Sequence, residues 1–139
     1  MSEEENKAKT RRFMDEVFNK GNMAVISELF APTFVDHNPF PGYPPGLEGF
    51  KQGVAAFRKG FPDLHLTVDD LIAEGDKVVF RSTMSGTHKG DFMGTPATGK
   101  QVKVAGIDIV RIVGGKAVEH WGITENLEMM QQLGLVPKM

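Results

Sequence analysis

The hydrophobic pattern of the chain changes its period after Pro62, and this change limits the possible folds more than any other feature. Up to Phe61, apolar residues recur every three or four positions, as on the buried face of a helix. The clearest such run is Leu47, Phe50, Val54, Phe57 and Phe61. From Leu64 onward, apolar and polar residues alternate, as in a half-buried strand. Helices followed by antiparallel strands predict an α+β fold, with the helices packed on one face of a sheet.

Capping and turn residues set the ends of the expected elements. Ser2 and Glu5 have the spacing of a capping box, Gly21 ends the first helix, Asn22 can cap the second, and Pro32 stops it. A stiff loop with four prolines and two glycines, at 39–46, precedes the third helix. We expect strands at 34–38, 64–68, 78–87, 101–113 and 116–124, and a last helix at 126–133.

Composition excludes several classes of protein. At 139 residues, the chain has the length of a single domain, 1–139, with its own core. Sixteen Lys and Arg against 18 Asp and Glu leave a net charge of −2, which gives no basic surplus for nucleic acid or an anionic membrane. The absence of cysteine excludes disulfides and thiolate chemistry. No apolar run reaches the ~18 residues of a membrane span, and the acidic start is unlike a signal peptide, so we expect a cytoplasmic protein.

A first polar cluster, Asp36-His37-Asn38, lies at the end of an expected strand and just before the proline-rich loop. Three side chains that form hydrogen bonds could line the mouth of a pocket there. The alternative is turn chemistry, because Asp and Asn at strand ends bond to their own backbone.

A second polar feature is the hairpin around Gly114-Gly115. Asp108 interrupts an apolar strand, where an unpartnered carboxylate is costly, and His120 lies on the return strand. A two-residue turn would place Asp108 opposite Trp121. A three-residue turn with a bulge at Gly115 would place Asp108 opposite His120 and Gly106 opposite Gly122. We favour the second register, because it gives the carboxylate a partner.

An Asp–His pair can perform acid–base chemistry, because the carboxylate favours the imidazolium and fixes its orientation. The alternative is a structural ion pair. A metal site made of His37, His88 and His120 is a weaker hypothesis, because no two of them have a short ligand spacing, and we predict no metal.

The second half of the chain also carries a motif that resembles a known family. Residues 86–100 read GTHKGDFMGTPATGK, residues 106–108 read GID, Arg111 follows, and residues 114–121 read GGKAVEHW. The N-terminal helix pair followed by FVDHNP at 34–39, and QLG at 132–134, fit as well. With these residues, almost the whole chain resembles the SnoaL-like polyketide cyclases of the NTF2-like superfamily.

The resemblance implies a cone-shaped α+β barrel, in which N-terminal helices pack on a strongly curved, mainly antiparallel sheet around a deep apolar pocket. It implies a homodimer or higher homo-oligomer formed through the sheet. It also implies chemistry on an apolar small molecule without a cofactor. The cyclases close a ring by intramolecular aldol condensation with a pocket carboxylate, and related pockets act as isomerases, lyases or hydrolases.

This sequence departs from the family at one position. The cyclases carry an Asp directly after the stretch that matches Glu119-His120-Trp121, and here that position is Gly122. We therefore predict that Asp108 is the general base, that His120 orients it or moves the proton, and that His37 and Asn38 hold the substrate oxygen. A non-catalytic domain that binds small molecules is the alternative, and a pure dimerisation scaffold is a third class. The predicted substrate-binding residues are Asp36, Asn38, Phe40, Tyr43, His88, Phe92, Met93, Trp121 and Gly122.

Overall fold

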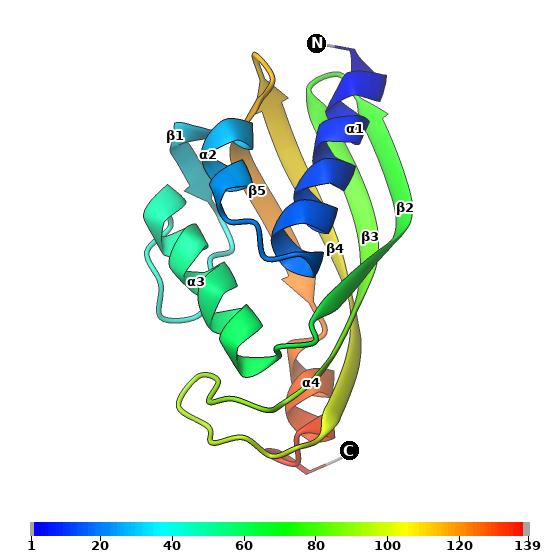
Figure 1. Cartoon of the computed structure of the whole chain (residues 1–139). Coiled ribbons are helices and arrows are strands. Elements are labelled where there is room, and N and C mark those ends of the chain that lie inside the picture. Colours follow the sequence, from blue (N-terminus) through cyan, green and yellow to red (C-terminus); the bar gives the residue numbers. More distant parts are fainter. Residues whose placement is uncertain (1, 138–139) are drawn as a thin grey trace.

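The computed structural model describes residues 2–137. Over this range the chain forms four α-helices, one π-helix and five strands (Figure 1). The N-terminal elements are α1 (Glu3–Phe13), the π-helix η1 (Met14–Asn19), α2 (Ala24–Leu29), β1 (Phe30–Asp36) and α3 (Leu47–Gly60). The remaining elements are β2 (His65–Glu74), β3 (Lys77–Thr87), β4 (Gln101–Val113), β5 (Lys116–Thr124) and α4 (Asn126–Gln132). This order confirms the α+β prediction.

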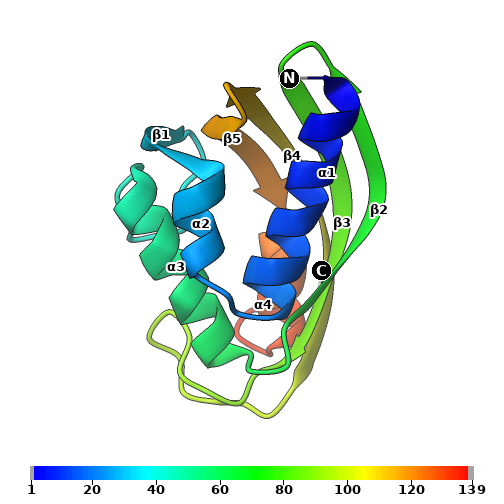
Figure 2. The same cartoon turned by 45° about the horizontal axis from the view of Figure 1, so that its top comes forward.

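The strands of residues 2–137 form one sheet in the order β1-β5-β4-β3-β2. The pair β1–β5 is parallel and the other pairs are antiparallel. The sheet is strongly curved, and α1, α2 and α3 lie over its concave face (Figure 2). The expected barrel is therefore not closed: β1 and β2 form the two edges, and helices cover the space between them. Pro32 fits an edge strand, because proline has no N–H to donate to a neighbour.

The helix ends agree with the sequence in part. The capping box is confirmed, since the Glu5 N–H donates to Ser2 Oγ over 3.1 Å and the Ser2 N–H donates to Glu5 Oε1 over 3.3 Å. The cap predicted at Asn22 is wrong: α2 begins at Ala24 with no side-chain cap, and Asn22 Nδ2 bonds instead to Glu16 Oε2. Helix α2 also ends at Leu29, before the predicted stop, because Phe30 already has extended backbone and pairs with β5.

The β4–β5 hairpin corrects the register that we favoured. Gly114 and Gly115 form a two-residue turn with positive φ angles of 60° and 80°, and Val113 pairs with Lys116. A bulge follows, because Ile112 pairs with Ala117 but Arg111 pairs with Glu119, which leaves Val118 as an extra residue. Asp108 consequently lies opposite Gly122, and neither His120 nor Trp121 occupies that position.

The core lies between the helices and the concave face of the sheet. One cluster contains the fully or almost fully buried Val17, Ile26, Phe34, Val54 and Val78, and a second surrounds Phe61 near α4. The predicted stripe of α3 is confirmed at Phe50 and Val54, which are buried, and at Phe61, which is buried at the end of the helix. No helix among residues 2–137 is long and apolar enough to cross a membrane.

Candidate functional site

A large cavity lies between the helices and the concave face of the sheet. Its volume is about 1220 Å³, which is ample for a ligand of several rings. Apolar side chains form most of its wall, among them Phe13, Phe34, Phe50, Phe57 and Met84. An open cavity of this size argues against a pure scaffold, whose interior would be filled by its own side chains.

Three acid–base side chains meet in this cavity. Nδ1 of His120 lies 2.7 Å from Oδ1 of Asp36, and Nε2 of His120 lies 2.7 Å from Oδ1 of Asp108. The Asp36 side chain is 3% exposed, and the side chains of His120 and Asp108 are each 19% exposed. Both imidazole nitrogens are thus held by carboxylates, and we call this row of three residues the Asp36–His120–Asp108 row.

Backbone pairing places the members of the row. Asp36 is the last residue of β1 and lies opposite His120 in the parallel ladder. Asp108 lies on β4 opposite Gly122, two residues beyond His120 on the same face of β5. The carboxylate and the imidazole therefore meet diagonally, which neither predicted register anticipated.

Asp36 is also fixed by its local turn. The Asn38 N–H donates to Asp36 Oδ1 over 3.0 Å, and the Asp36 N–H donates to the Pro45 carbonyl over 2.7 Å. The two interpretations of the Asp36-His37-Asn38 cluster are therefore compatible, because one carboxylate closes a turn and also binds the imidazole in the cavity.

The row holds a proton on His120. Burial by itself lowers the pKa of His120, but the hydrogen bonds to Asp108 and Asp36, with their negative charges, outweigh it and raise the pKa from 6.5 to about 9. At neutral pH the imidazole is therefore a cation between two carboxylates. A protonated imidazole can donate a proton but cannot accept one.

Gly122 leaves room for the Asp36–His120–Asp108 row, because it has no Cβ atom. A Cβ atom at Gly122 would lie 2.0 Å from Oδ1 of Asp108 and 2.9 Å from Nε2 of His120. The Gly122 N–H donates to Asn38 Oδ1 over 3.0 Å. This bond fixes the Asn38 amide, whose NH₂ group makes no hydrogen bond within residues 2–137 and remains free for a ligand, because Asn38 lines the cavity.

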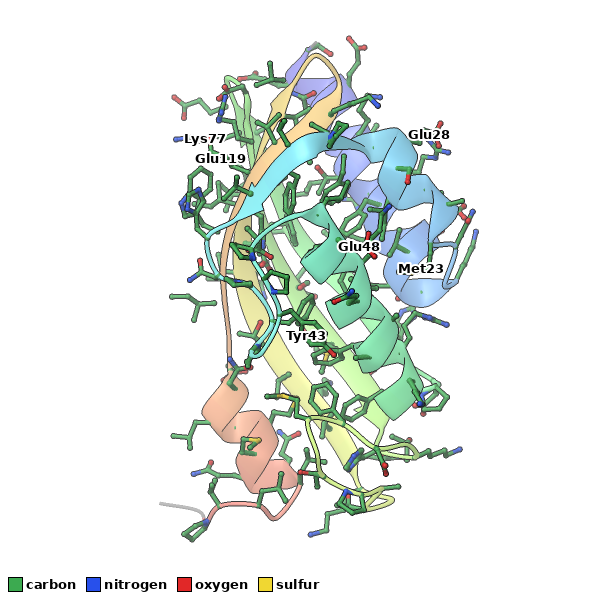
Figure 3. All side chains as sticks on the ribbon, turned by 90° about the vertical axis from the view of Figure 1, so that its left-hand side faces the viewer. Met23, Glu28, Tyr43, Glu48, Lys77 and Glu119 are labelled. Carbon is green, nitrogen blue, oxygen red and sulfur yellow. The ribbon has the colours of Figure 1, made fainter. Side chains whose placement is uncertain are left out.

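The rings of His37 and Trp121 lie apart from the Asp36–His120–Asp108 row, although His37 is among the residues that line the cavity. The two rings stack with their centroids 4.8 Å apart at an interplanar angle of 7°, and His37 Nε2 lies 2.8 Å from Glu119 Oε2. Lys77 Nζ lies 5.7 Å from the Trp121 ring. Figure 3 shows Lys77 and Glu119 together on the side of the sheet away from α3. The structure therefore does not bring the His37 ring to Asp108, because residues 119 and 121 alternate with His120 to the other face of β5.

His88 does not line the cavity. Its side chain is fully buried, stacks on Phe61 and accepts the Thr98 N–H at Nδ1 over 3.2 Å. This placement corrects its predicted role in substrate binding, since the ring closes the base of the 88–100 loop. The three histidines of the metal hypothesis lie in three separate environments, and residues 2–137 contain no cluster arranged to hold a metal ion.

The remaining predicted wall residues do line the cavity: Phe40, Tyr43, Phe92 and Met93. Phe40 packs against Gly53 of α3, where a Cβ atom would lie 2.2 Å from its ring. Tyr43 lies on the segment between β1 and α3 (Figure 3). Met93 is exposed, at a positive φ of 50°, in a tight turn closed by mutual backbone bonds between Phe92 and Thr95.

Sequence reasoning missed two polar cavity residues on the sheet, Ser82 and Thr124. The signal available in the sequence was strand alternation. Ser82 lies two residues after buried Phe80, and Thr124 lies four residues after His120, so each lies on the same face of its strand as that residue.

An open, curved sheet under helices, with polar groups gathered in an apolar cavity, defines a small-molecule-binding domain of the NTF2-like fold. A model of the SnoaL-like polyketide cyclase family matches residues 8–133. The chain therefore belongs to the SnoaL-like polyketide cyclase family.

Individual relatives agree with this assignment. The aklanonic acid methyl ester cyclases DnrD of Streptomyces peucetius and DauD of Streptomyces sp. (strain C5) are each 30% identical over 129 residues. These matches cover 88% of this chain and 87% and 78% of the respective relatives. The solved structure of TsrD from Streptomyces laurentii matches with a TM-score of 0.88 at 31% identity, over 98% of this chain and 99% of that one.

Proposed function

We propose that the protein is an acid–base enzyme of the cyclase type, which needs no cofactor and acts on an apolar small molecule that carries carbonyl groups. The Asp36–His120–Asp108 row carries this proposal, because it places a carboxylate and a charged imidazole inside an apolar cavity of about 1220 Å³. Membership of the cyclase family supports the same class of reaction.

Asp108 is the general base of this proposal. Its Oδ1 accepts a hydrogen bond from His120, whereas its Oδ2 has no partner within residues 2–137 and belongs to a side chain that lines the cavity. His120 is already protonated at neutral pH, so it holds Asp108 in place and balances its charge. Asp36 positions His120 from the opposite side.

The reaction that fits these groups is an intramolecular aldol closure. Asp108 Oδ2 removes a proton from a carbon between two carbonyl groups, which is acidic enough for a carboxylate base. The resulting enolate carbon attacks a second carbonyl carbon in the same molecule, one C–C bond forms, and the new alkoxide takes the proton back from Asp108. The free NH₂ group of Asn38 can hold the enolate oxygen. No electrons leave the substrate, so the step needs no oxidant or reductant.

The test is turnover by an Asp108→Asn variant. We expect a loss of ~100-fold or more and at most a modest drop in melting temperature, because the amide can still accept the bond from His120 but cannot take a proton. The substrate panel should hold β-dicarbonyl compounds and aklanonic acid methyl ester, the compound for which the relatives DnrD and DauD are named.

Asp91→Asn is the matched control, because Asp91 is exposed on the 88–100 loop. It should turn over like the unmodified protein. Full activity of Asp108→Asn would contradict the proposal, and a large drop in its melting temperature would place Asp108 among the structural residues.

A ligand-binding domain without catalysis is the second candidate, and Gly122 favours it. The cyclases that this sequence resembles carry an Asp at that position. Under this alternative, ligand affinity would be the same in the unmodified protein and in Asp108→Asn at every pH between 5 and 8.

Two further features stay proposals. We infer a homodimer formed through the outer face of the sheet, because exposed apolar side chains gather there. A cytoplasmic location rests on the sequence alone.

A further inference from the structure

The cavity floor has a second polar row beside the acid–base group. In the sheet register, Phe80, Asp108 and Gly122 lie side by side on β3, β4 and β5. Two residues along these strands, Ser82, Gly106 and Thr124 lie side by side on the same face, and all three line the cavity. Because two residues of a strand span about 6.6 Å and neighbouring strands lie about 4.8 Å apart, Ser82 is about 8 Å from Asp108.

The middle of this row is bare backbone, because Gly106 has no side chain and lines the cavity. A Cβ atom at Gly106 would meet Thr124 Oγ1 at 3.2 Å and the Ile123 carbonyl at 3.3 Å, both within the sheet itself. At Gly53 and Gly60, by contrast, a Cβ atom would run into the rings of Phe40 and Phe92, which already fill the space. The space above Gly106 therefore belongs to the cavity.

The hydroxyl groups beside this gap are unpartnered. Ser82 is 5% exposed, and its hydroxyl makes no hydrogen bond within residues 2–137. Thr124 Oγ1, on the other side of Gly106, likewise makes none over the same residues. Both residues line the cavity, and neither hydroxyl is among the fully buried unpartnered polar atoms of residues 2–137, so both can be reached by a ligand oxygen from the cavity.

We propose that Ser82, Gly106 and Thr124 form a second polar subsite, which binds an oxygen substituent of a flat ring compound whose reacting carbon lies at Asp108. The placement of the reacting carbon at Asp108 rests on the proposed function. The subsite itself rests on the positions of Ser82, Gly106 and Thr124 in the sheet. A hydroxyl can donate to a carbonyl or quinone oxygen and can accept from a phenol, so the ligand class is flat, apolar on its faces and oxygenated at two separated positions.

A pair of simple probes tests this subsite without turnover. Naphthalen-1-ol carries one oxygen, and naphthalene-1,5-diol carries two on opposite rings. Isothermal titration calorimetry would measure both dissociation constants for the unmodified protein, Ser82→Ala and Thr124→Val. Ser85→Ala is the matched control, because Ser85 lies on the same strand but on the opposite face.

We expect the diol to bind the unmodified protein about 3- to 10-fold more tightly than the mono-ol, which is the gain of one hydrogen bond. Ser82→Ala should abolish this preference and leave the affinity for the mono-ol unchanged, and Ser85→Ala should retain the preference. Thr124→Val, which keeps the shape of the side chain, should reduce the preference and provides a second readout if Ser82→Ala folds poorly.

Equal affinities of the two probes for the unmodified protein would overturn the subsite, as would binding of neither probe. A preference that survives in both Ser82→Ala and Thr124→Val would also overturn it. A failure of the proposed function would give a different result. Asp108→Asn would keep its turnover, and the unmodified protein would still bind the diol more tightly than the mono-ol.

Discussion

At the scale of single residues, the site depends on a charge that a buried histidine does not usually keep. His120 remains an imidazolium because Asp36 and Asp108 each hold one of its nitrogens at 2.7 Å. Because His120 already carries its proton at neutral pH, it cannot accept another, and the proposed base of the Asp108–His120 pair is therefore Asp108. The proposed chemistry and the stability of the protein are therefore linked to one proton.

This linkage predicts how stability depends on pH. The folded state raises the pKa of His120 to about 9 from 6.5, so the stabilisation is complete below pH 6.5 and is lost as the pH rises through 9. We expect the free energy of unfolding to fall by roughly 3 kcal/mol between pH 6 and pH 10. Urea unfolding at a series of pH values measures this change. His120→Gln should remove the fall, and a flat profile of the unmodified protein would refute the prediction.

Gly122 gives a second prediction at this scale. Gly122→Ala would place a methyl group 2.0 Å from Oδ1 of Asp108, so the Asp108–His120 bond should break. Without this bond, the pKa of His120 should fall towards its ordinary value, and NMR titration of the imidazole protons measures it. Gly106→Ala is the control, because its methyl group lies on the same face but meets Thr124 and not the acid–base row. An unshifted His120 in Gly122→Ala would contradict this account.

At the scale of elements, one side chain ties the N-terminal helices to the sheet. Asn19, the last residue of η1, accepts the Leu66 N–H over 2.6 Å and donates to the Leu66 carbonyl over 3.0 Å. The amide thus pairs with the edge strand β2 as another strand would, and this contact fixes η1 over the cavity, where Met14 and Phe18 form part of the wall.

We expect Asn19→Ala to lower the free energy of unfolding by about 2 kcal/mol, because two half-buried backbone groups lose their partner. Urea unfolding measures this loss. Asn22→Ala is the matched control, since Asn22 is exposed and makes only a long bond to Glu16, and it should change stability by less than about 0.5 kcal/mol. Equal losses in the two variants would show that the contact with Leu66 does not anchor η1.

At the scale of the whole molecule, the two faces of the sheet have different roles. The helices lie over the concave face (Figure 2), and the cavity lies between the two. The outer face exposes large apolar side chains on three strands, β2, β4 and β5: Ile72, Ile107, Val113 and Ile123. Apolar side chains clustered on an exposed face are typical of an interface between protein chains.

This face predicts a homodimer. Light scattering after size-exclusion chromatography should give twice the chain mass of 15.3 kDa for the unmodified protein. Ile107→Glu should give the mass of one chain, because a charge in the middle of a dimer interface would be buried without a partner. Gln52→Glu, which adds the same charge to an exposed position of α3, should remain a dimer. A monomeric unmodified protein would exclude this interface.

The sequence by itself determined the order and type of the elements. The change of hydrophobic period predicted helices before strands, and the strands at 101–113 and 116–124 have the predicted bounds, because alternation and turn residues act over a few neighbouring positions. The family motif predicted the fold. Asp108 was recognised as a candidate because a carboxylate in an apolar strand needs a partner, His120 as its partner on the return strand, and Asp36 as part of a polar cluster at a strand end.

Only the tertiary structure decided how these residues meet. The bulge at Val118 shifted the hairpin register so that Asp108 lies opposite Gly122, and a bulge depends on packing along both strands rather than on the turn residues alone. The parallel pairing of β1 with β5 brought Asp36 to His120 across 84 positions of the chain, and the alternation of strand faces placed Trp121 on the outer face of β5, where its ring stacks on His37. Local propensity acts on neighbours, whereas the partners of a buried charge are chosen by contacts between distant segments, and those contacts exist only in the folded molecule.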